Sequence, residues 1–457
     1  MNVSSSIVVV AIAFLAGACT HITEIRTTHT SAPHPELNVA DPAFQCGIGE
    51  KVDGEYTNSI EDYGKYFLGV VEFDDQGWTY DRSDQMQALE SRLKQELADP
   101  QYNETDFLTV VFIHGWHHNA HDNDCNVNEF RSMLRRISEK YDALYPGTFK
   151  HRRRVVGIYV GWRGEAMNIP GIRYLSIVDR RYTAEHVAKG SVREVFAMLR
   201  KHQFAEQSKS QRPDRVRTVV IGHSFGGLIA FHGLSQALLN ELALGKPNPD
   251  IGCNSAVSRK ETTTKIPAWP DMVVLINPAF EASRFEALHH LMEPVKDCPY
   301  EKELRPKLVV VTADNDSATG FFFPLFRRIG TVTEGYDESI PRSESRERES
   351  NWHAIGFVDR YRTHRLCLQS VDGGEPRAVA ALAPPKSPDW TQDEFAPIWV
   401  IGAPPEIVNG HDGFLYARKT GKAPQPYLLE WLINLHAIGA KSPVVAPTGS
   451  CGSWDSK

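Results

Sequence analysis

Short apolar runs rich in β-branched residues alternate along this chain with longer segments in which apolar residues recur every three or four positions. The runs predict strands, and the wider spacing predicts helices. The expected strands cover residues 66–73, 107–113, 155–161, 215–221, 272–276, 308–312 and 398–401. The expected helices cover residues 84–97, 128–144, 182–202, 228–242 and 427–436. This alternation is typical of a mostly parallel sheet with helices on both faces, so we expect an α/β fold.

The composition fits one large globular body. The chain has 457 residues, of which 41% are hydrophobic and 23% are charged, so it can bury a sizeable core. Its net charge of −7 gives no reason to expect nucleic-acid binding. We expect a catalytic domain over residues 59–440, followed by a tail over residues 441–457.

Two stretches of the expected domain look like insertions, near residues 245–270 and 321–390. The second contains an apolar cluster at residues 321–326, which is either part of the core or an acyl-facing wall of a substrate site. Because buried aromatic residues usually serve packing, we prefer the core interpretation.

The N-terminal residues indicate export. Residues 7–18 form a short uncharged apolar run, which is typical of a signal peptide over residues 1–19. The run ends at Leu15-Ala16-Gly17-Ala18-Cys19, which resembles a bacterial lipobox and implies a lipid anchor on Cys19 in the periplasm or outer membrane. A plain secretory signal is the alternative. Residues 20–58 are polar and turn-rich and predict a flexible arm. The six other cysteines allow disulfides, whose pairing the sequence leaves open.

A single serine stands at the junction of an expected strand and an expected helix. The junction reads Gly222-His223-Ser224-Phe225-Gly226, after the β-branched run 218–221 and before a helical apolar pattern. The glycines allow a tight turn that lifts the serine hydroxyl above the sheet edge. We therefore predict that Ser224 is a nucleophile.

A serine nucleophile needs a histidine base and an acid that orients it. In open α/β sheets such groups follow the carboxyl ends of strands. His411 follows the last expected strand, so we predict that it is the base. Two acids, Asp314 and Asp316, follow the strand before it. We prefer Asp316 because the turn needs several residues before its carboxylate can face the histidine.

Backbone N–H groups are expected to stabilise the oxyanion. One is that of Phe225, which follows the nucleophile at a helix N-terminus. The other is that of Trp116, because Gly115 lets the chain turn sharply after the expected strand 107–113.

Histidines and aspartates also gather over residues 117–124, where His117 and His121 have the separation of zinc ligands on a helix. The asparagines and aspartates there favour a polar loop instead. We therefore expect no metal site.

Together, His114-Gly115, the Gly-His-Ser-Phe-Gly-Gly motif and the late acid and histidine resemble the α/β-hydrolase superfamily, of the serine esterase and lipase kind. The resemblance covers residues 66–436 and implies an eight-stranded sheet and an acyl-enzyme intermediate, without a cofactor. We expect hydrolysis of small-molecule or lipid carboxylic esters. A peptidase or amidase on the same residues, and an inactive binding module of this fold, are the alternatives.

Overall fold

The structure is a computed structural model that describes most of the chain in twelve separate pieces. These are residues 23–35, 55–80, 84–164, 176–245, 269–292, 305–330, 335, 343–371, 374–382, 396–414, 426–438 and 451. The expected signal segment with Cys19 lies outside them. So do residues 246–268 of the first expected insertion and all of the expected tail except Cys451.

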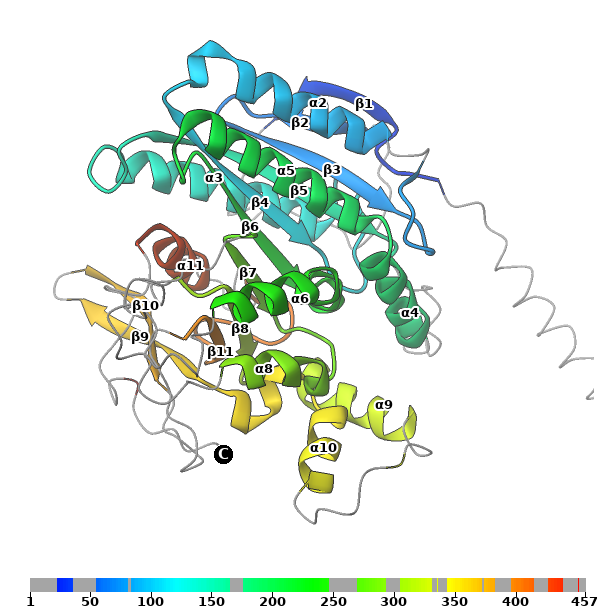
Figure 1. Ribbon diagram of the computed structural model, residues 1–457. Helices are drawn as coiled ribbons and strands as arrows, with labels where there is room; N and C mark the ends of the chain where they lie inside the picture. Colours follow the sequence, from blue (N-terminus) through cyan, green and yellow to red (C-terminus); the bar gives the residue numbers. More distant parts are fainter. Residues whose placement is uncertain are drawn as a thin grey trace, which may run out of the picture.

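An eleven-stranded, mostly parallel sheet runs through the molecule (Figure 1), and the α/β class is confirmed. The strand order is β1-β2-β3-β5-β4-β6-β7-β8-β11-β9-β10. Eight consecutive strands, from β3 to β9 in this order, are parallel, and β2 and β10 run antiparallel to them. All seven expected strands are present. The strands are β1 Thr28–Pro33, β2 Asn58–Asp62, β3 Tyr66–Phe73, β4 Thr105–Ile113, β5 Arg152–Trp162, β6 Val216–His223, β7 Met272–Ile276, β8 Leu308–Ala313, β9 His364–Val371, β10 Gly374–Leu382 and β11 Ile398–Ala403.

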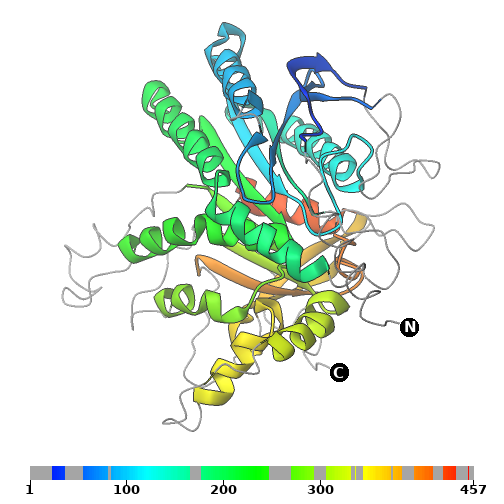
Figure 2. The ribbon, with the colours of Figure 1, turned by 90° about the vertical axis from the view of Figure 1, so that its right-hand side faces the viewer.

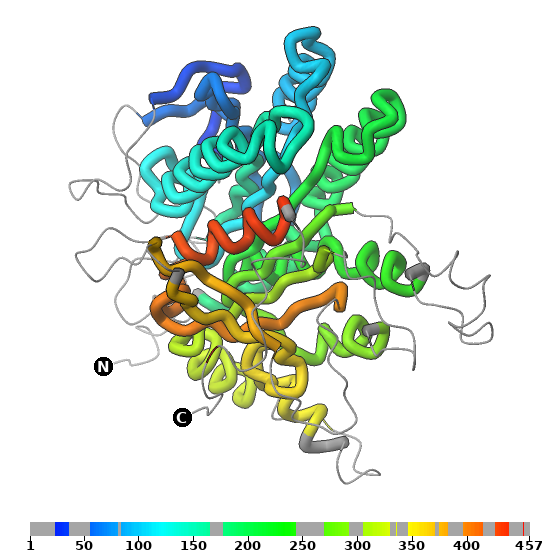
Figure 3. The backbone as a smooth tube through the Cα atoms, turned by 90° about the vertical axis from the view of Figure 1, so that its left-hand side faces the viewer, coloured from blue at the N-terminus to red at the C-terminus, as the bar shows by residue number. Residues whose placement is uncertain are grey.

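Helices cover both faces of the sheet. The α-helices are α2 Asp84–Ala98, α3 Cys125–Leu144, α4 Ser176–Lys189, α5 Val192–Ser210, α6 Phe225–Gly245, α8 Glu286–Met292, α9 Phe323–Gly330, α10 Ser343–Trp352 and α11 Tyr427–Ile438. Core residues of α3 and α11 pack on one face, and those of α2, α4, α5, α6 and α8 pack on the other. Figure 3 shows α11 beside α3, where Tyr141 and His436 are joined by a hydrogen bond of 2.8 Å. No helix in the described ranges is both long and apolar enough to cross a membrane.

The central strands are buried on both sides, which explains their continuous apolar sequences. In β7, Val273 and Leu275 join the core under α6, whereas Met272, Val274 and Ile276 join the core under α3 and α11. Successive side chains of a strand point to opposite faces, so a strand covered by helices on both faces must be apolar throughout.

The single helix expected over residues 182–202 is wrong. The structure has two helices there, α4 and α5, separated at Gly190 and Ser191. The amide of Ser191 donates to the carbonyl of Gly77, 2.8 Å away, so a distant loop takes a backbone group that a continuous helix would use internally.

The expected arm is also wrong where the structure describes it. Residues 28–33 form β1, and the neighbouring Arg26 is fully buried. Its guanidinium lies 3.1 Å from the carboxylate of Glu61, and its amide donates to Glu72 over 2.8 Å. A polar sequence is ordered here because a buried arginine needs carboxylate and carbonyl partners, which the body of the protein supplies.

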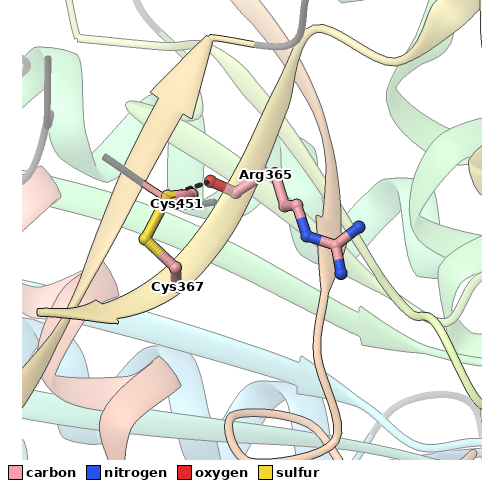
Figure 4. Close-up of a disulfide and its surroundings, with 3 residues drawn as sticks. All are labelled: Arg365, Cys367 and Cys451. Carbon is pink, nitrogen blue, oxygen red and sulfur yellow. Dashed lines mark hydrogen bonds between the residues drawn. A yellow bond between two sulfur atoms is a disulfide. The ribbon is translucent and has the colours of Figure 1, made fainter. Parts of the chain in front are cut away.

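The second expected insertion instead completes the sheet and adds a helical layer. Residues 364–382 form the hairpin β9–β10 at the sheet edge, so the sheet exceeds the eight strands that the resemblance implied. A disulfide joins Cys367 of β9 to Cys451 (Figure 4). The charged run before Trp352 forms α10, which packs against α9.

Candidate active site

Five neighbouring strands end at one edge of the sheet and place the predicted groups. In sheet order these are β4, β6, β7, β8 and β11. The loops that follow β4, β6, β8 and β11 carry Trp116, Ser224, Asp316 and His411, respectively. Because parallel strands end at the same edge, residues far apart in the sequence meet there.

Ser224 occupies a tight turn between β6 and α6. Its φ angle is +55°, which is unusual for a residue other than glycine, and α6 begins at the next residue. The turn presses closely on the end of β4, since a Cβ built at Gly226 would lie 2.0 Å from the carbonyl oxygen of Ile113. Only glycine fits at position 226, because any side chain there would collide with the end of β4.

The three side chains predicted for catalysis form one hydrogen-bonded chain. The Oγ of Ser224 lies 2.8 Å from Nε2 of His411, and Nδ1 of His411 lies 2.9 Å from Oδ2 of Asp316. Ser224 and Asp316 are buried, while about a fifth of the His411 side chain is exposed. This geometry allows the histidine to take the serine proton while the aspartate orients the ring.

The two candidate acids have different partners in the structure. Asp316 faces His411 and also accepts hydrogen bonds from the hydroxyl of Thr319 and the amide of Ala318. Asp314 pairs instead with Arg365 over 2.7 Å. The preference for Asp316 over Asp314 as the partner of His411 therefore agrees with the observed geometry.

The surroundings shift the pKa values of His411 and Asp316 in opposite directions. Burial disfavours the charged imidazolium, but the carboxylate of Asp316 outweighs it and raises the pKa of His411 above its ordinary 6.5. Burial raises the pKa of Asp316, but the positive charge of the His411 ring and hydrogen bonds from His411 and Thr319 outweigh this effect. The pKa of Asp316 therefore lies below its ordinary 3.8. Such opposed shifts are typical of a histidine poised to accept a proton.

The two expected oxyanion donors lie on segments that border Ser224. A Cβ built at Gly115 would lie 2.9 Å from Cβ of Ser224, so the chain at residues 115–116 passes directly beside the nucleophile. Phe225 is the first residue of α6, and the N–H of a first helical residue has no acceptor within its helix. The assignment of Trp116 and Phe225 to the oxyanion stays a prediction.

Two residues of the site were missed by the sequence reasoning. Asn277, directly after β7, has a φ of +45° and donates to the carbonyls of Gly410 and His411 over 3.0 and 2.7 Å. Nε2 of His223 also donates to the His411 carbonyl, over 2.9 Å. Burial, followed by repulsion from His411, lowers the pKa of His223 to about 3, so this ring is neutral. An asparagine at a strand end was the available signal.

Two histidines of the histidine-rich loop contact different carboxylates. His118 contacts Asp124 at 3.0 Å, and His121 contacts Glu55 at 2.7 Å. His117 has a φ of +75°, so His117 and His121 do not share a helix face. The loop interpretation of residues 117–124 therefore fits the structure.

Three other groupings bring possible metal ligands within 4.8 Å of one another in the described ranges. The groupings are His223–His411–Asp412, Glu286–His289–His290 and His34–Glu61–Asp122. The first contains the predicted base His411, and in the second Glu286 already accepts a hydrogen bond from the Tyr361 hydroxyl. In the third, two arginines pair with the carboxylates.

No protein-family model matches the chain, and no curated protein matches it. Among solved structures, it is similar at 15% identity to a phospholipase, PlaB from Legionella pneumophila, in complex with thio-NAD. That match covers 61% of this chain and 50% of the other, with a TM-score of 0.22. An uncharacterized protein from Pseudomonas aeruginosa matches at 12% identity over 78% and 48% of the two chains, with a TM-score of 0.25. The chain thus spans about half the length of either, and these weak likenesses do not define a shared fold.

Proposed function

We propose that this protein is a serine hydrolase of the α/β-hydrolase type that cleaves carboxylic esters. The observation that carries the proposal is the hydrogen-bonded chain from Ser224 through His411 to Asp316, with distances of 2.8 and 2.9 Å. The positive φ of Ser224 adds support, because strained backbone concentrates at functional sites.

In the proposed reaction, Oγ of Ser224 attacks the ester carbonyl carbon as its proton passes to Nε2 of His411. The tetrahedral oxyanion is stabilised by the N–H groups of Phe225 and Trp116. When the carbon–oxygen bond to the alcohol breaks, the leaving oxygen takes the proton from Nε2. A water molecule then repeats the sequence on the acyl-enzyme, releasing the acid and restoring Ser224. Asp316 orients the ring throughout, and no cofactor enters these steps.

The test is labelling with a fluorophosphonate, followed by turnover of a panel of esters. Wild type should be labelled, and Ser224→Ala and His411→Ala should not. Ser235→Ala is the matched control, because Ser235 lies on the same helix α6 and its hydroxyl donates to the His232 carbonyl instead. Folded wild type that resists labelling would contradict the proposal and favour the binding-module alternative. Faster turnover of a matched amide than of its ester would favour a peptidase or amidase.

We also propose that the protein is exported. The apolar run and Cys19 at the N-terminus support this, and the Cys367–Cys451 disulfide fits an oxidising compartment. Mass spectrometry of the mature N-terminus should find diacylated Cys19. An unmodified N-terminus near residue 19 would favour the plain secretory signal instead.

A further inference from the structure

The segment that follows the proposed acid exposes most of its large apolar side chains. Residues 318–330 form the π-helical turn η6 (Ala318–Phe322) and helix α9. Sequence reasoning placed residues 321–326 in the core, and for three of the six this is wrong. Phe321, Phe322 and Leu325 are 64%, 44% and 46% exposed, and Ile329 farther along is 68% exposed. Phe323 is buried and anchors the segment.

A second helix adds to this surface. Val178 and Tyr182 on α4 are four residues apart, which places them on one side of the helix, and they are 50% and 61% exposed. Six of the eight exposed large apolar residues in the described ranges thus lie on η6, α9 and α4. We call these six the apolar rim: Val178, Tyr182, Phe321, Phe322, Leu325 and Ile329.

The two helices are fixed to one buried carboxylate. Arg181 of α4 and Arg327 of α9 both pair with Glu281, the latter over 3.0 Å. Figures 1 and 2 place α4 and α9 on the same side of the molecule. Shared ion pairs to Glu281 therefore join α4 to α9.

Four residues of the apolar rim lie on the segment that follows the proposed acid in the sequence. The carboxylate of Asp316 accepts hydrogen bonds from the amides of Ala318 and Thr319, over 2.9 and 3.3 Å. The carboxylate that contacts His411 therefore also fixes the first turn of η6.

The charge of the segment indicates what the apolar rim contacts. Residues 318–330 contain no acidic residue and two arginines, of which Arg327 pairs with Glu281 and Arg328 is exposed beside Ile329. On α4, the exposed Asp179 lies next to Val178. Exposed aromatic and aliphatic side chains flanked by arginine are typical of helices that lie in the interface of an anionic bilayer.

We propose that the apolar rim docks the protein on an anionic phospholipid surface, with the site opening toward the lipid. This inference rests on the proposed function and deepens it, because the substrate class becomes esters of lipids held in a bilayer or other aggregate. The apolar side chains enter the acyl boundary, and the arginine contacts the lipid phosphates.

Vesicle co-sedimentation of the full chain tests the proposal. All proteins carry Ser224→Ala and Cys19→Ser, so that neither hydrolysis nor lipidation contributes. Vesicles of phosphatidylcholine mixed with phosphatidylglycerol should bind the otherwise unchanged protein more tightly than vesicles of phosphatidylcholine alone. Phe321→Ser and Leu325→Ser should each weaken binding by about tenfold or more. Phe204→Ser is the control, since Phe204 is an exposed apolar residue on α5, outside the apolar rim.

Equal binding of the rim variants and the control would overturn the proposal. So would a dimer that dissociates in Phe321→Ser without any vesicle binding, because the apolar rim would then contact a second copy. Turnover of a dissolved short-chain ester, measured with Ser224 intact, separates the two proposals. It should be unchanged in Phe321→Ser, and its absence from wild type would contradict the hydrolase proposal while leaving the binding result valid.

Discussion

The side-chain amide of Asn277 donates a 2.7 Å hydrogen bond to the backbone carbonyl of His411. The same amide donates to Gly410 over 3.0 Å, and its oxygen accepts the N–H of Ala313 over 2.8 Å. One buried residue at the end of β7 therefore joins the end of β8 to the loop that carries the proposed base. The position of the imidazole depends on this contact as well as on Asp316.

Removal of the Asn277 amide should misplace His411. We expect Asn277→Gly to lower kcat by about 10²-fold with little change in KM, because a displaced base affects the chemical step. Glycine accepts the positive φ of this position, so the variant isolates the amide from backbone strain. Steady-state kinetics on an ester measure the effect, with Asn240→Ala, an exposed position on α6, as control. Unchanged kcat in Asn277→Gly would show that the loop holds its position without the amide.

The two acids after β8 should respond very differently to loss of charge. Asp316→Asn should lower kcat by about 10³ to 10⁴-fold, because the ring of His411 loses the partner that fixes its tautomer. Asp314→Asn, which removes only the pairing with Arg365, should stay within a few-fold of wild type. Parallel kinetics of both variants decide the matter. A larger loss in Asp314→Asn would reverse the assignment.

The pH profile of ester turnover should report the pKa of His411. The base must be neutral, so kcat/KM should fall as the pH decreases through a pKa that Asp316 raises above 6.5. In Asp316→Asn the residual activity should keep its acidic limb, displaced to lower pH, because the stabilising carboxylate is gone. A limb that stays in place in this variant would mean that another group controls it.

Glu281 should contribute strongly to stability. It is 2% exposed, and three arginines, at positions 181, 284 and 327, outweigh its burial and lower its pKa to about 2. We expect Glu281→Gln to lower the free energy of unfolding by about 2–3 kcal/mol at neutral pH, because three partly buried guanidinium groups lose a shared carboxylate while Arg181 and Arg284 keep Glu185. Denaturant unfolding measures this, with the exposed Glu104→Gln as control.

The pH dependence of that stability has a definite sign. A carboxylate whose pKa falls on folding stabilises the protein above its unfolded pKa, here about 4.5, and the contribution disappears as the pH falls toward 2. The difference between wild type and Glu281→Gln should shrink across this window. A constant difference would show that the glutamate acts through packing and not through its charge.

The sequence by itself determined the central strands, the turn at Ser224 and the order of the candidate groups along the chain. These features depend on neighbouring residues: β-branched runs form strands buried on both faces, and the glycine at position 226 permits the tight turn. Because parallel strands end at a common edge, the sequence predicted that Ser224, an acid and His411, in this order along the chain, meet in one site.

Tertiary structure alone decided which acid faces His411, the role of Asn277, and the exposure of the residues after Asp316. Each depends on contacts between segments far apart in the sequence, such as Asn277 with the carbonyl of His411. The aromatic run after Asp316 suggested packing, yet Phe321, Phe322 and Leu325 are exposed while Phe323 is buried, and an ion pair joins α9 to Glu281. Local pattern reports which side chains prefer burial, whereas the arrangement of distant segments determines which of them are buried.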